Sequence, residues 1–313
     1  MKYIIKKIGT LILTLFIISF LSFLAFQIIP GDAALSRLGT DATPEQVEAL
    51  REEMGLNAPM LVRYGNWLKD FVSGDFGTSY SYNMPVSEML AGKLPITLVL
   101  TALSFLLILA ISIPLGLFTG SREGSRLDRA TMMANQVLMS IPGFFLGILI
   151  TAVLGLGMKL FIPGAYVSYR EDFGGFLYYL IFPAIAIALP KCAMGVKMLR
   201  SSVIGQLHMD YVRTAYSKGN SQHRVMYHHI LKNAMIPVLT FWALTISDIV
   251  ANSIIIEQVF TIPGLGSMLI QSISNRDYPV VQAIIVMVAG LVVVINFLVD
   301  LLYTKIDPRV TIE

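Results

Sequence analysis

Six long apolar stretches constrain this chain more than any other feature. A helix needs about 20 apolar residues to cross the hydrocarbon core of a bilayer, and six segments approach or exceed that length. They are residues 8–29, 98–118, 132–161, 176–190, 238–256 and 280–303. We therefore expect an all-α polytopic membrane protein with six transmembrane helices.

Composition agrees with this reading and excludes several other classes. The chain is 55% hydrophobic and 14% charged, whereas a soluble domain is about 25% charged. A single cysteine excludes a disulfide framework and a multi-cysteine metal site. The short fourth span contains two prolines, and we expect it to continue past Lys191 toward Met198, with the lysine snorkelling. The first span is longer than the apolar core of a signal peptide, so a retained helix is preferred over a cleaved leader.

The distribution of charge predicts an orientation. Basic residues are enriched on the cytoplasmic side of short membrane loops. Threading six spans places the N-terminus, residues 119–131, residues 191–237 and the C-terminus on one side, and most Lys and Arg lie there. Acidic residues are more numerous in 30–97, 162–175 and 257–279. Both termini are therefore expected to be cytoplasmic.

The connection between the first two spans should contain two helices. Thr43 and Gln46 form a capping box, and Gly55 ends the helix that they begin. Apolar residues at helical spacing predict a second helix between Pro59 and Gly74. The segment fits either a small extracytoplasmic cap that buries its own aromatic face or a docking or gating element at the mouth of a pore.

The internal connection, 191–237, is basic and helical. It contains seven Lys or Arg residues against Asp210 alone, and all four histidines of the chain. Leu207, Tyr211 and Ala215 share one helix face, and Gly219 then breaks the chain. Asn220 or Ser221 caps a second helix with a stripe of Met226, Ile230 and Ala234, and Pro237 opens the fifth span. Such a segment fits either a lipid-headgroup surface or a protruding knob that another protein grips.

Motifs of enzymatic chemistry are absent. Gly92-Lys93 is followed by Leu94, so there is no phosphate-binding loop, and neither a Gly-x-Ser-x-Gly elbow nor a His-Glu-x-x-His helix occurs. Adjacent His228 and His229 cannot share a helix face. We expect no catalytic residue, no metal site and no cofactor in this chain.

Three polar residues of the fifth span and its outer end are candidates for a substrate pathway or gate: Asp248, Asn252 and Glu257. Intramembrane carboxylates are costly and usually face an aqueous cavity or a partner. The competing interpretation is a hydrogen-bonded Asp248 that holds helices together.

Several segments together resemble a known family. The internal loop reads DYVRTAYSKG at 210–219 and HILKNAMIP at 229–237. The other matching segments are PGD at 30–32, GDFGTS at 74–79, EQVFTIPGLG at 257–266, NRDYP at 275–279 and DPR at 307–309. The loop resembles the EAA loop of ABC-importer permeases, with Arg213 and Thr214 where Glu and Ala usually head the pattern. More narrowly, the chain is similar to the first, or B-type, permease of the dipeptide/oligopeptide/nickel family.

The resemblance implies a type I ABC-importer transmembrane domain in a bacterial inner membrane. Its parts would be the first helix (1–29), a large extracytoplasmic loop (30–97) and a five-helix core (98–313) that includes the coupling loop. Its partners would be a second permease subunit in a heterodimer, two ABC ATPase subunits that bind ATP and Mg²⁺, and an extracytoplasmic binding lipoprotein; no nucleic acid is implied. The residues implied in coupling to an ATPase are Tyr211, Arg213, Thr214, Ala215, Lys218 and Gly219.

The resemblance implies import of dipeptides or oligopeptides, with nickel or a metal chelate as the alternative substrate. Two other classes compete with it. A self-sufficient secondary transporter would need a coupling-ion site and usually shows inverted repeats, and no repeat is seen. A membrane scaffold without a transport role is the third hypothesis.

Overall fold

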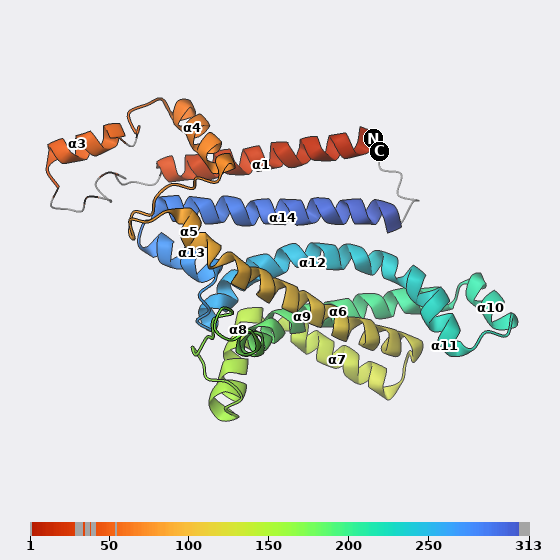
Figure 1. Ribbon diagram of the computed structural model, residues 1–313. Coiled ribbons are helices and arrows are strands. Elements are labelled where there is room, and N and C mark those ends of the chain that lie inside the picture. The colour runs from red at the N-terminus through yellow and green to blue at the C-terminus, as the bar shows by residue number, and fades with distance from the viewer. Residues whose placement is uncertain (1, 29–33, 35–37, 39–41, 54, 307–313) are drawn as a thin grey trace. The chain divides into compact units, whose positions relative to one another are not determined.

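The computed structural model describes residues 2–28, 34, 38, 42–53 and 55–306, and most of these residues lie in helices joined by loops and turns (Figure 1). Within these ranges the β-structure is one isolated bridge between Thr78 and Pro85. Two motifs of the family resemblance, 30–32 and 307–309, lie outside the described residues.

The helices of the first part are α1 (Lys2–Ile28), α3 (Pro44–Glu53), α4 (Met60–Ser73), α5 (Val86–Ala91) and α6 (Leu94–Ser121). They are followed by α7 (Arg126–Ser140), α8 (Gly143–Ile150), the π-helical η1 (Thr151–Gly157), α9 (Phe173–Leu207), α10 (Asp210–Ser217), α11 (Gln222–Arg224), the π-helical η2 (Val225–Ile230), α12 (Leu231–Val259), α13 (Leu265–Ser274) and α14 (Tyr278–Ile306).

Five of the described helices are long and apolar enough to cross a membrane, and a bent pair makes a sixth candidate. The prediction of a polytopic helical membrane protein is confirmed. The fourth span was expected to extend beyond Lys191, and α9 indeed runs for 35 residues to Leu207.

The third predicted span, 132–161, is wrong as a single helix. α7 ends at Ser140 and α8 begins at Gly143, and the two axes differ by 101°. Pro142 is the cause. The residue before a proline is pushed out of the helical conformation, and Ile141 has φ −95° and ψ 124°. Proline lacks an N–H, which is no loss at the start of the next helix, where that group would be unpaired.

The chain forms two compact units. The first consists of Met1–Ile96 and Pro263–Val294, and the second of Thr97–Ile262 and Ile295–Glu313. The core of the first unit brings together apolar residues from α5, α13 and the beginning of α14: Val86, Leu90, Leu265, Met268, Val280, Ala283 and Ile284.

A buried carboxylate joins two motifs of the first unit. Asp277 has no exposed surface. It accepts a 2.5 Å hydrogen bond from Ser79 Oγ and a 2.9 Å bond from the backbone N–H of Tyr80. Segments 74–79 and 275–279, which are separate motifs in the sequence, are therefore joined by a hydrogen bond to one buried carboxylate.

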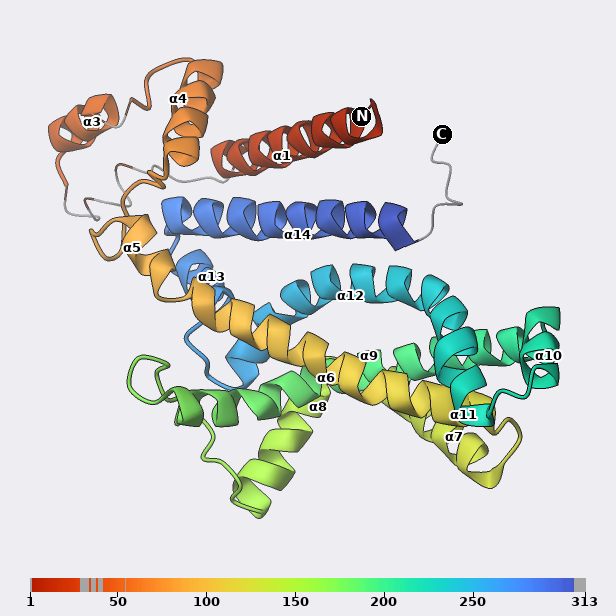
Figure 2. The same ribbon diagram turned by 45° about the vertical axis from the view of Figure 1, so that its right-hand side comes forward.

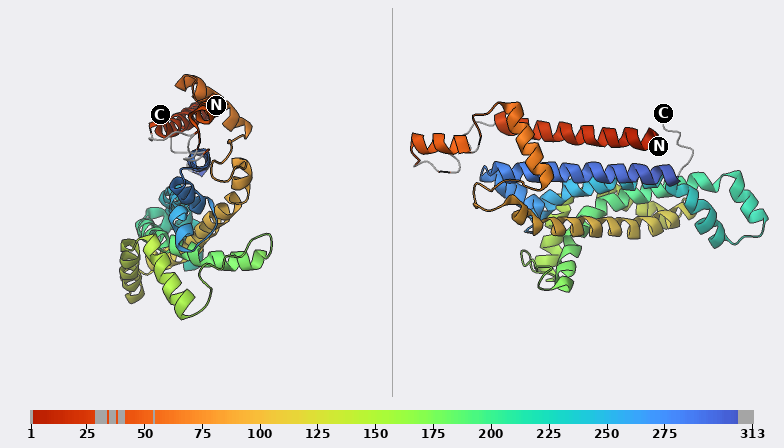
Figure 3. Two further views of the ribbon diagram at one scale, coloured as in Figure 1. Left: turned by 90° about the vertical axis from the view of Figure 1, so that its left-hand side faces the viewer. Right: turned by 45° about the horizontal axis from the view of Figure 1, so that its top comes forward.

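The helices expected in the connection after the first span are present in the first unit. The Gln46 N–H donates to Thr43 Oγ1 at 3.4 Å, and the Thr43 N–H donates to Gln46 Oε1 at 3.0 Å. Gly55 and Gly74, which follow the two helices, adopt positive φ. The aromatic face of α4 packs partly on α1 and partly within its own segment, where the rings of Phe71 and Phe76 lie 4.8 Å apart. Tyr64 Oη lies 2.8 Å from Ser19 Oγ, and the right-hand view of Figure 3 shows α4 crossing α1 near the end at which α1 finishes.

In the second unit, α9 is the central helix and packs against α7, α8 and α12. Two glycines of α6 allow a close approach to it. A Cβ built on Gly116 would lie 2.8 Å from Leu199 Cβ, and one on Gly120 would lie 2.8 Å from Val203 Cβ. The Gly-x-x-x-Gly spacing of α6 is therefore a packing device, because any larger residue would separate the two helices.

Replacing Gly116 with alanine should destabilise the chain. The added methyl meets Leu199 at its Cβ, which cannot move without its backbone, so we expect a loss of about 1–3 kcal/mol. The measurement is unfolding in mixed micelles with a denaturing detergent. Gly205→Ala in α9 is the matched control, since a Cβ there meets no atom within 4 Å; equal effects of the two substitutions would contradict the packing argument.

Candidate functional site

The basic connection between α9 and α12 folds into a helical hairpin. α9 ends at Leu207, and Met209 is extended, with φ −80° and ψ 146°, before α10 begins. After the turn, α11 continues through η2 into α12 without a break, from Gln222 to Val259. α10 and α11 lie at the end of this unit where α9 finishes (Figures 1 and 2).

Two expectations for this segment need correction. Leu207 and Tyr211 were expected in one helix, but the extended Met209 separates α9 from α10. Pro237 does not open the fifth span, because it lies inside α12. A helix can continue through a proline at the loss of one hydrogen bond. The buried stripe of Met226, Ile230 and Ala234 precedes Pro237, and buried Val238 follows it directly.

The turn of the hairpin is built on Gly219. Its φ of +78° is the left-handed conformation that ends helices. Its N–H donates to the Tyr216 carbonyl at 2.9 Å, and Asn220 Nδ2 donates to the Ala215 carbonyl at 3.0 Å. Ser221 Oγ then caps α11 by accepting from the Arg224 N–H at 3.4 Å. The predicted break at Gly219 and the cap at Ser221 are confirmed, and hydrogen bonds hold both the turn and the start of α11.

α10 has an inner and an outer face. Val212 and Ala215 are buried and face η2, where Val225 and Met226 are also buried. Tyr211 is half-buried, and its hydroxyl donates to Gln206 Oε1 at 2.7 Å. The outer face is exposed and consists of Arg213, Thr214, Tyr216, Ser217, Lys218 and Gly219.

Of the six residues predicted to couple to an ATPase, four therefore lie on an exposed surface: Arg213, Thr214, Lys218 and Gly219. Ala215 is 6% exposed and packs inside the hairpin, so its contribution is to the shape of the hairpin. Tyr216 and Ser217 were not predicted, although their positions between exposed neighbours on a short helix could have indicated them.

The predicted polar residues of the fifth span occupy two places. Asp248 Oδ2 pairs with Lys191 Nζ of α9, and Asn252 Nδ2 donates to Asp248 Oδ1 at 3.2 Å. The pair is partly exposed, with 46% of the Asp248 side chain accessible. Lys191 was expected to snorkel; it is instead bonded across to α12, because an opposite charge lies within its reach.

Glu257 is not part of that group. Its side chain is fully buried and accepts a 2.6 Å hydrogen bond from Thr97 Oγ1. Nine residues of α-helix, about 13 Å, separate it from Asp248.

A second charged pair, which the sequence did not predict, ties α7 to α9. Arg200 Nε and Nη2 donate to the two carboxylate oxygens of Asp128 at 2.5 and 2.7 Å. Asp128 is 2% exposed and also accepts from the Gly124 N–H. An arginine that bonds a carboxylate through two nitrogens fixes both the separation and the relative orientation of the two side chains. α7 and α9 are therefore held rigidly together two turns before the hairpin.

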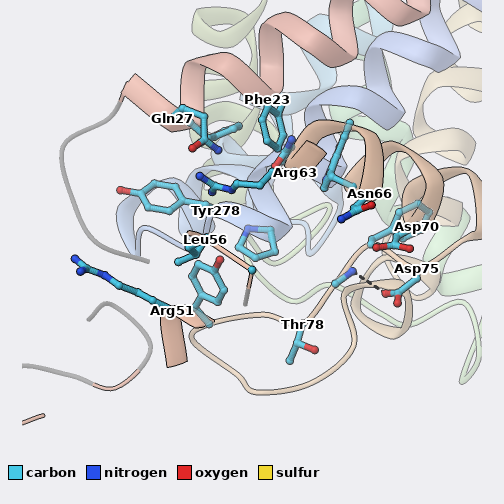
Figure 4. Close-up of a pocket in the computed structure, with 18 of the residues that line it drawn as sticks. Phe23, Gln27, Arg51, Leu56, Arg63, Asn66, Asp70, Asp75, Thr78 and Tyr278 are labelled. Atoms are coloured by element: carbon cyan, nitrogen blue, oxygen red, sulfur yellow. Dashed lines mark hydrogen bonds between the residues drawn. The ribbon is translucent and has the colours of Figure 1, made fainter. Parts of the chain in front are cut away.

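The first unit contains a separate open cavity of about 900 Å³ (Figure 4). Phe23, Phe26 and Gln27 at the end of α1 contribute to its wall, and so do Tyr278 and Gln282 of α14. From α4 the lining residues are Arg63, Asn66, Trp67 and Asp70. The cavity is therefore mostly polar where α4 forms its wall.

In the ranges described above, no group of three or more His, Cys, Asp or Glu residues lies close enough to hold an ion. His223 stacks on Tyr227 with ring centroids 4.4 Å apart, so this histidine has a packing partner.

Similarity to known proteins covers nearly the whole length of the chain. Residues 112–312 match the family described as binding-protein-dependent transport system inner membrane component, and residues 1–101 match the N-terminal family of such components. The oligopeptide transport system permease protein AppB of Bacillus subtilis (strain 168) is 37% identical over 311 residues, with 98% of each chain covered. The dipeptide transport system permease protein DppB of Alkalihalophilus pseudofirmus is 34% identical, with 99% of each covered. A putative peptide transport system permease protein of Brucella abortus (strain 2308) is 37% identical over 98% of each.

Removing one member of the Lys191–Asp248 pair should lower the unfolding free energy more than removing both members does. Lys191→Met leaves a carboxylate without its partner inside an apolar helix, and we expect a loss of about 1–3 kcal/mol in unfolding free energy. Lys191→Met with Asp248→Leu should recover most of it. Unfolding in mixed micelles is the measurement, and Lys197→Met, an exposed lysine of the same helix, is the control. A double variant that is less stable than either single variant would refute the pairing.

Proposed function

This chain belongs to the family of binding-protein-dependent transport system inner membrane components, and on that premise we propose that it forms half of the translocation pore of an ATP-driven peptide importer. It is a multi-pass membrane protein and a permease, a transport component rather than an enzyme. The observation that carries the proposal is the hairpin of α10 and α11, a rigid basic corner with an exposed outer face.

The hairpin is the proposed attachment point for the motor. Arg213, Thr214, Lys218 and Gly219 would sit in a groove on an ATPase subunit, and Tyr211 and Ala215 would keep the corner in shape. Since the hairpin is closed by its own hydrogen bonds, a force applied to the turn moves the corner as a body. The two positions of this lever would be biased by nucleotide bound to the ATPases.

We propose that the full assembly lies in the bilayer of a bacterial inner membrane and contains four further proteins. A second permease subunit completes the pore, two ATPase subunits bind ATP and Mg²⁺, and a lipid-anchored binding protein delivers the substrate from outside. The excess of Lys and Arg beside the hairpin and at the N-terminus supports cytoplasmic termini, with residues 30–97 outside.

Peptides are the proposed substrates. The relatives described above are named for peptide, dipeptide or oligopeptide transport, and this favours peptides over nickel or a metal chelate. We assign Asp248 and Asn252 to the pathway because they are partly exposed in a membrane-spanning helix. Glu257, fully buried against Thr97, fits a gate that changes partners when α12 moves.

A bulky residue at the turn should uncouple the transporter. In proteoliposomes that contain the permease pair, the ATPases and the binding protein, Gly219→Trp should abolish ATP-driven uptake, because the side chain would occupy the groove that receives the corner. A Cβ at Gly219 meets nothing within 4 Å inside this chain, so the chain should still fold, with a cost of about 1–2 kcal/mol for the left-handed backbone.

Gly124→Trp is the matched control, since Gly124 also has a positive φ (75°) and open space around its Cα, but lies between α6 and α7. It should retain uptake. Normal uptake by Gly219→Trp at normal protein levels would refute the coupling role.

The same proteoliposomes discriminate the substrates and the competing classes. We expect ATP-dependent uptake of a labelled di- or oligopeptide, no uptake of nickel, and no uptake by the permease pair alone. Uptake driven only by an ion gradient would instead indicate a secondary transporter. Assembled ATPases whose turnover does not respond to substrate-loaded binding protein would indicate a scaffold.

A further inference from the structure

α4 touches α1 far inside the apolar stretch of that helix. The membrane-span candidate of α1 runs from Lys6 to Gln27. The Tyr64 hydroxyl lies 2.8 Å from Ser19 Oγ and donates to the Phe16 carbonyl at 3.4 Å. At 1.5 Å per residue, Ser19 is about 12 Å and Phe16 about 16 Å from Gln27. Half of a bilayer's hydrocarbon core is about 15 Å thick, so Tyr64 reaches deep into one leaflet.

The side of α4 that faces α1 is aromatic. Tyr64 packs edge-on against Phe20, with ring centroids 5.1 Å apart, and Trp67 lies 5.9 Å from Phe23. Because Phe23 lies between Ser19 and the end of α1, Trp67 sits closer to the membrane surface than Tyr64 does.

The polar side of α4 points toward the end of α1. Arg63, Asn66 and Asp70 lie on one flank of the helix, and all three line the cavity whose wall includes Phe26 and Gln27 (Figure 4). Gln27 is the last residue of the apolar stretch. This flank therefore faces out of the membrane.

The opposite flank is apolar, and its two ends are exposed in the part of the unit that the structure describes, while Leu68 between them is half-buried. At about 100° per residue, Leu61, Gly65, Leu68 and Val72 lie nearly diametrically across from Arg63, Asn66 and Asp70. Leu61 is 69% and Val72 is 79% exposed. Since the polar flank faces outward, this flank faces the bilayer centre.

We propose that α4 is an interfacial helix that lies in the leaflet where α1 ends and presents Leu61, Leu68 and Val72 to lipid acyl chains. An amphipathic helix of this kind buries its apolar side at the boundary of headgroups and acyl chains. The long connection after the first span is then anchored to the bilayer as well as to α1. Lipid is favoured over a water-soluble partner because contact at the depth of Ser19 and Phe16 leaves the flank below the membrane surface.

Spin labels on the two flanks test the orientation. In a Cys192→Ala background, nitroxides are attached to Leu61→Cys and Val72→Cys, and to Asn66→Cys and Asp70→Cys as matched controls on the polar flank. The chain is placed in lipid nanodiscs, alone and in the assembled transporter. We expect O₂, which partitions into lipid, to relax the labels at 61 and 72, and a water-soluble nickel chelate to relax those at 66 and 70.

Labels at 61 and 72 that respond to the nickel chelate would overturn the proposal and make the segment an aqueous cap. Labels at these positions that respond to neither reagent in the assembled transporter would also overturn it, and would assign the flank to the second permease subunit. Both results leave the transport function untouched, because neither measurement involves uptake.

A second measurement needs no substitution in α4. The chain has two tryptophans, Trp67 and Trp242, so Trp242→Phe leaves Trp67 as the only reporter. Lipids brominated along the acyl chain should quench its fluorescence, most strongly when the bromines are near the headgroup. Absence of quenching by any brominated lipid would place α4 outside the bilayer and overturn the proposal.

Discussion

The lack of hydrogen-bonding partners in lipid is the constraint on which the rest of this structure depends. A backbone group without a partner in hydrocarbon is costly, so membrane segments are helical, and polar side chains in them must find partners too. Ser104 and Ser112 of α6 donate to the carbonyls of Leu100 and Ile108, one turn earlier in their own helix. Charged residues need a second helix: Lys191 is bonded to Asp248, and Glu257 to Thr97. The same bonds that satisfy these groups fix how α6, α9 and α12 lie against one another.

Features with a local cause could be predicted from the sequence. Long apolar runs gave the spans, since length and hydropathy alone decide whether a helix fits a bilayer. The bonds between Thr43 and Gln46, and the left-handed turn at Gly219, follow from residues within one turn of each other. The break at Pro142 is local as well, but it lies inside a run whose hydropathy is uniform, and the apolar signal concealed it.

Features made by pairing over long stretches of chain could not be predicted. Lys191 and Asp248 are 57 residues apart, Asp128 and Arg200 are 72 apart, and Ser79 and Asp277 are 198 apart. Each residue offers several equally plausible partners, and only the packing of helices chooses one. The candidate coupling residues show the same division. Their place on the hairpin was evident, but the burial of Ala215 and the exposure of Tyr216 depend on how α10 packs against η2.

The hairpin and the polar residues of the fifth span belong to one mechanical element. From Gln222 the helix runs without a break to Val259, so the turn at Gly219 is joined to Asp248 and Glu257 by continuous backbone. A helix is stiff along its axis, so under the proposed mechanism a displacement of the corner would be carried along it rather than absorbed in a loop. Two features condition that transfer. The first is the π-helical turn η2 at the base of the hairpin, which is wound more widely than an α-helix and can change its hydrogen-bonding register. The second is the bond between Asp128 and Arg200, which keeps α9 fixed to α7. If α12 moved against α9, the bond between Lys191 and Asp248 would have to stretch or break. The pair that holds these two helices together is therefore the contact on which such a motion would act first.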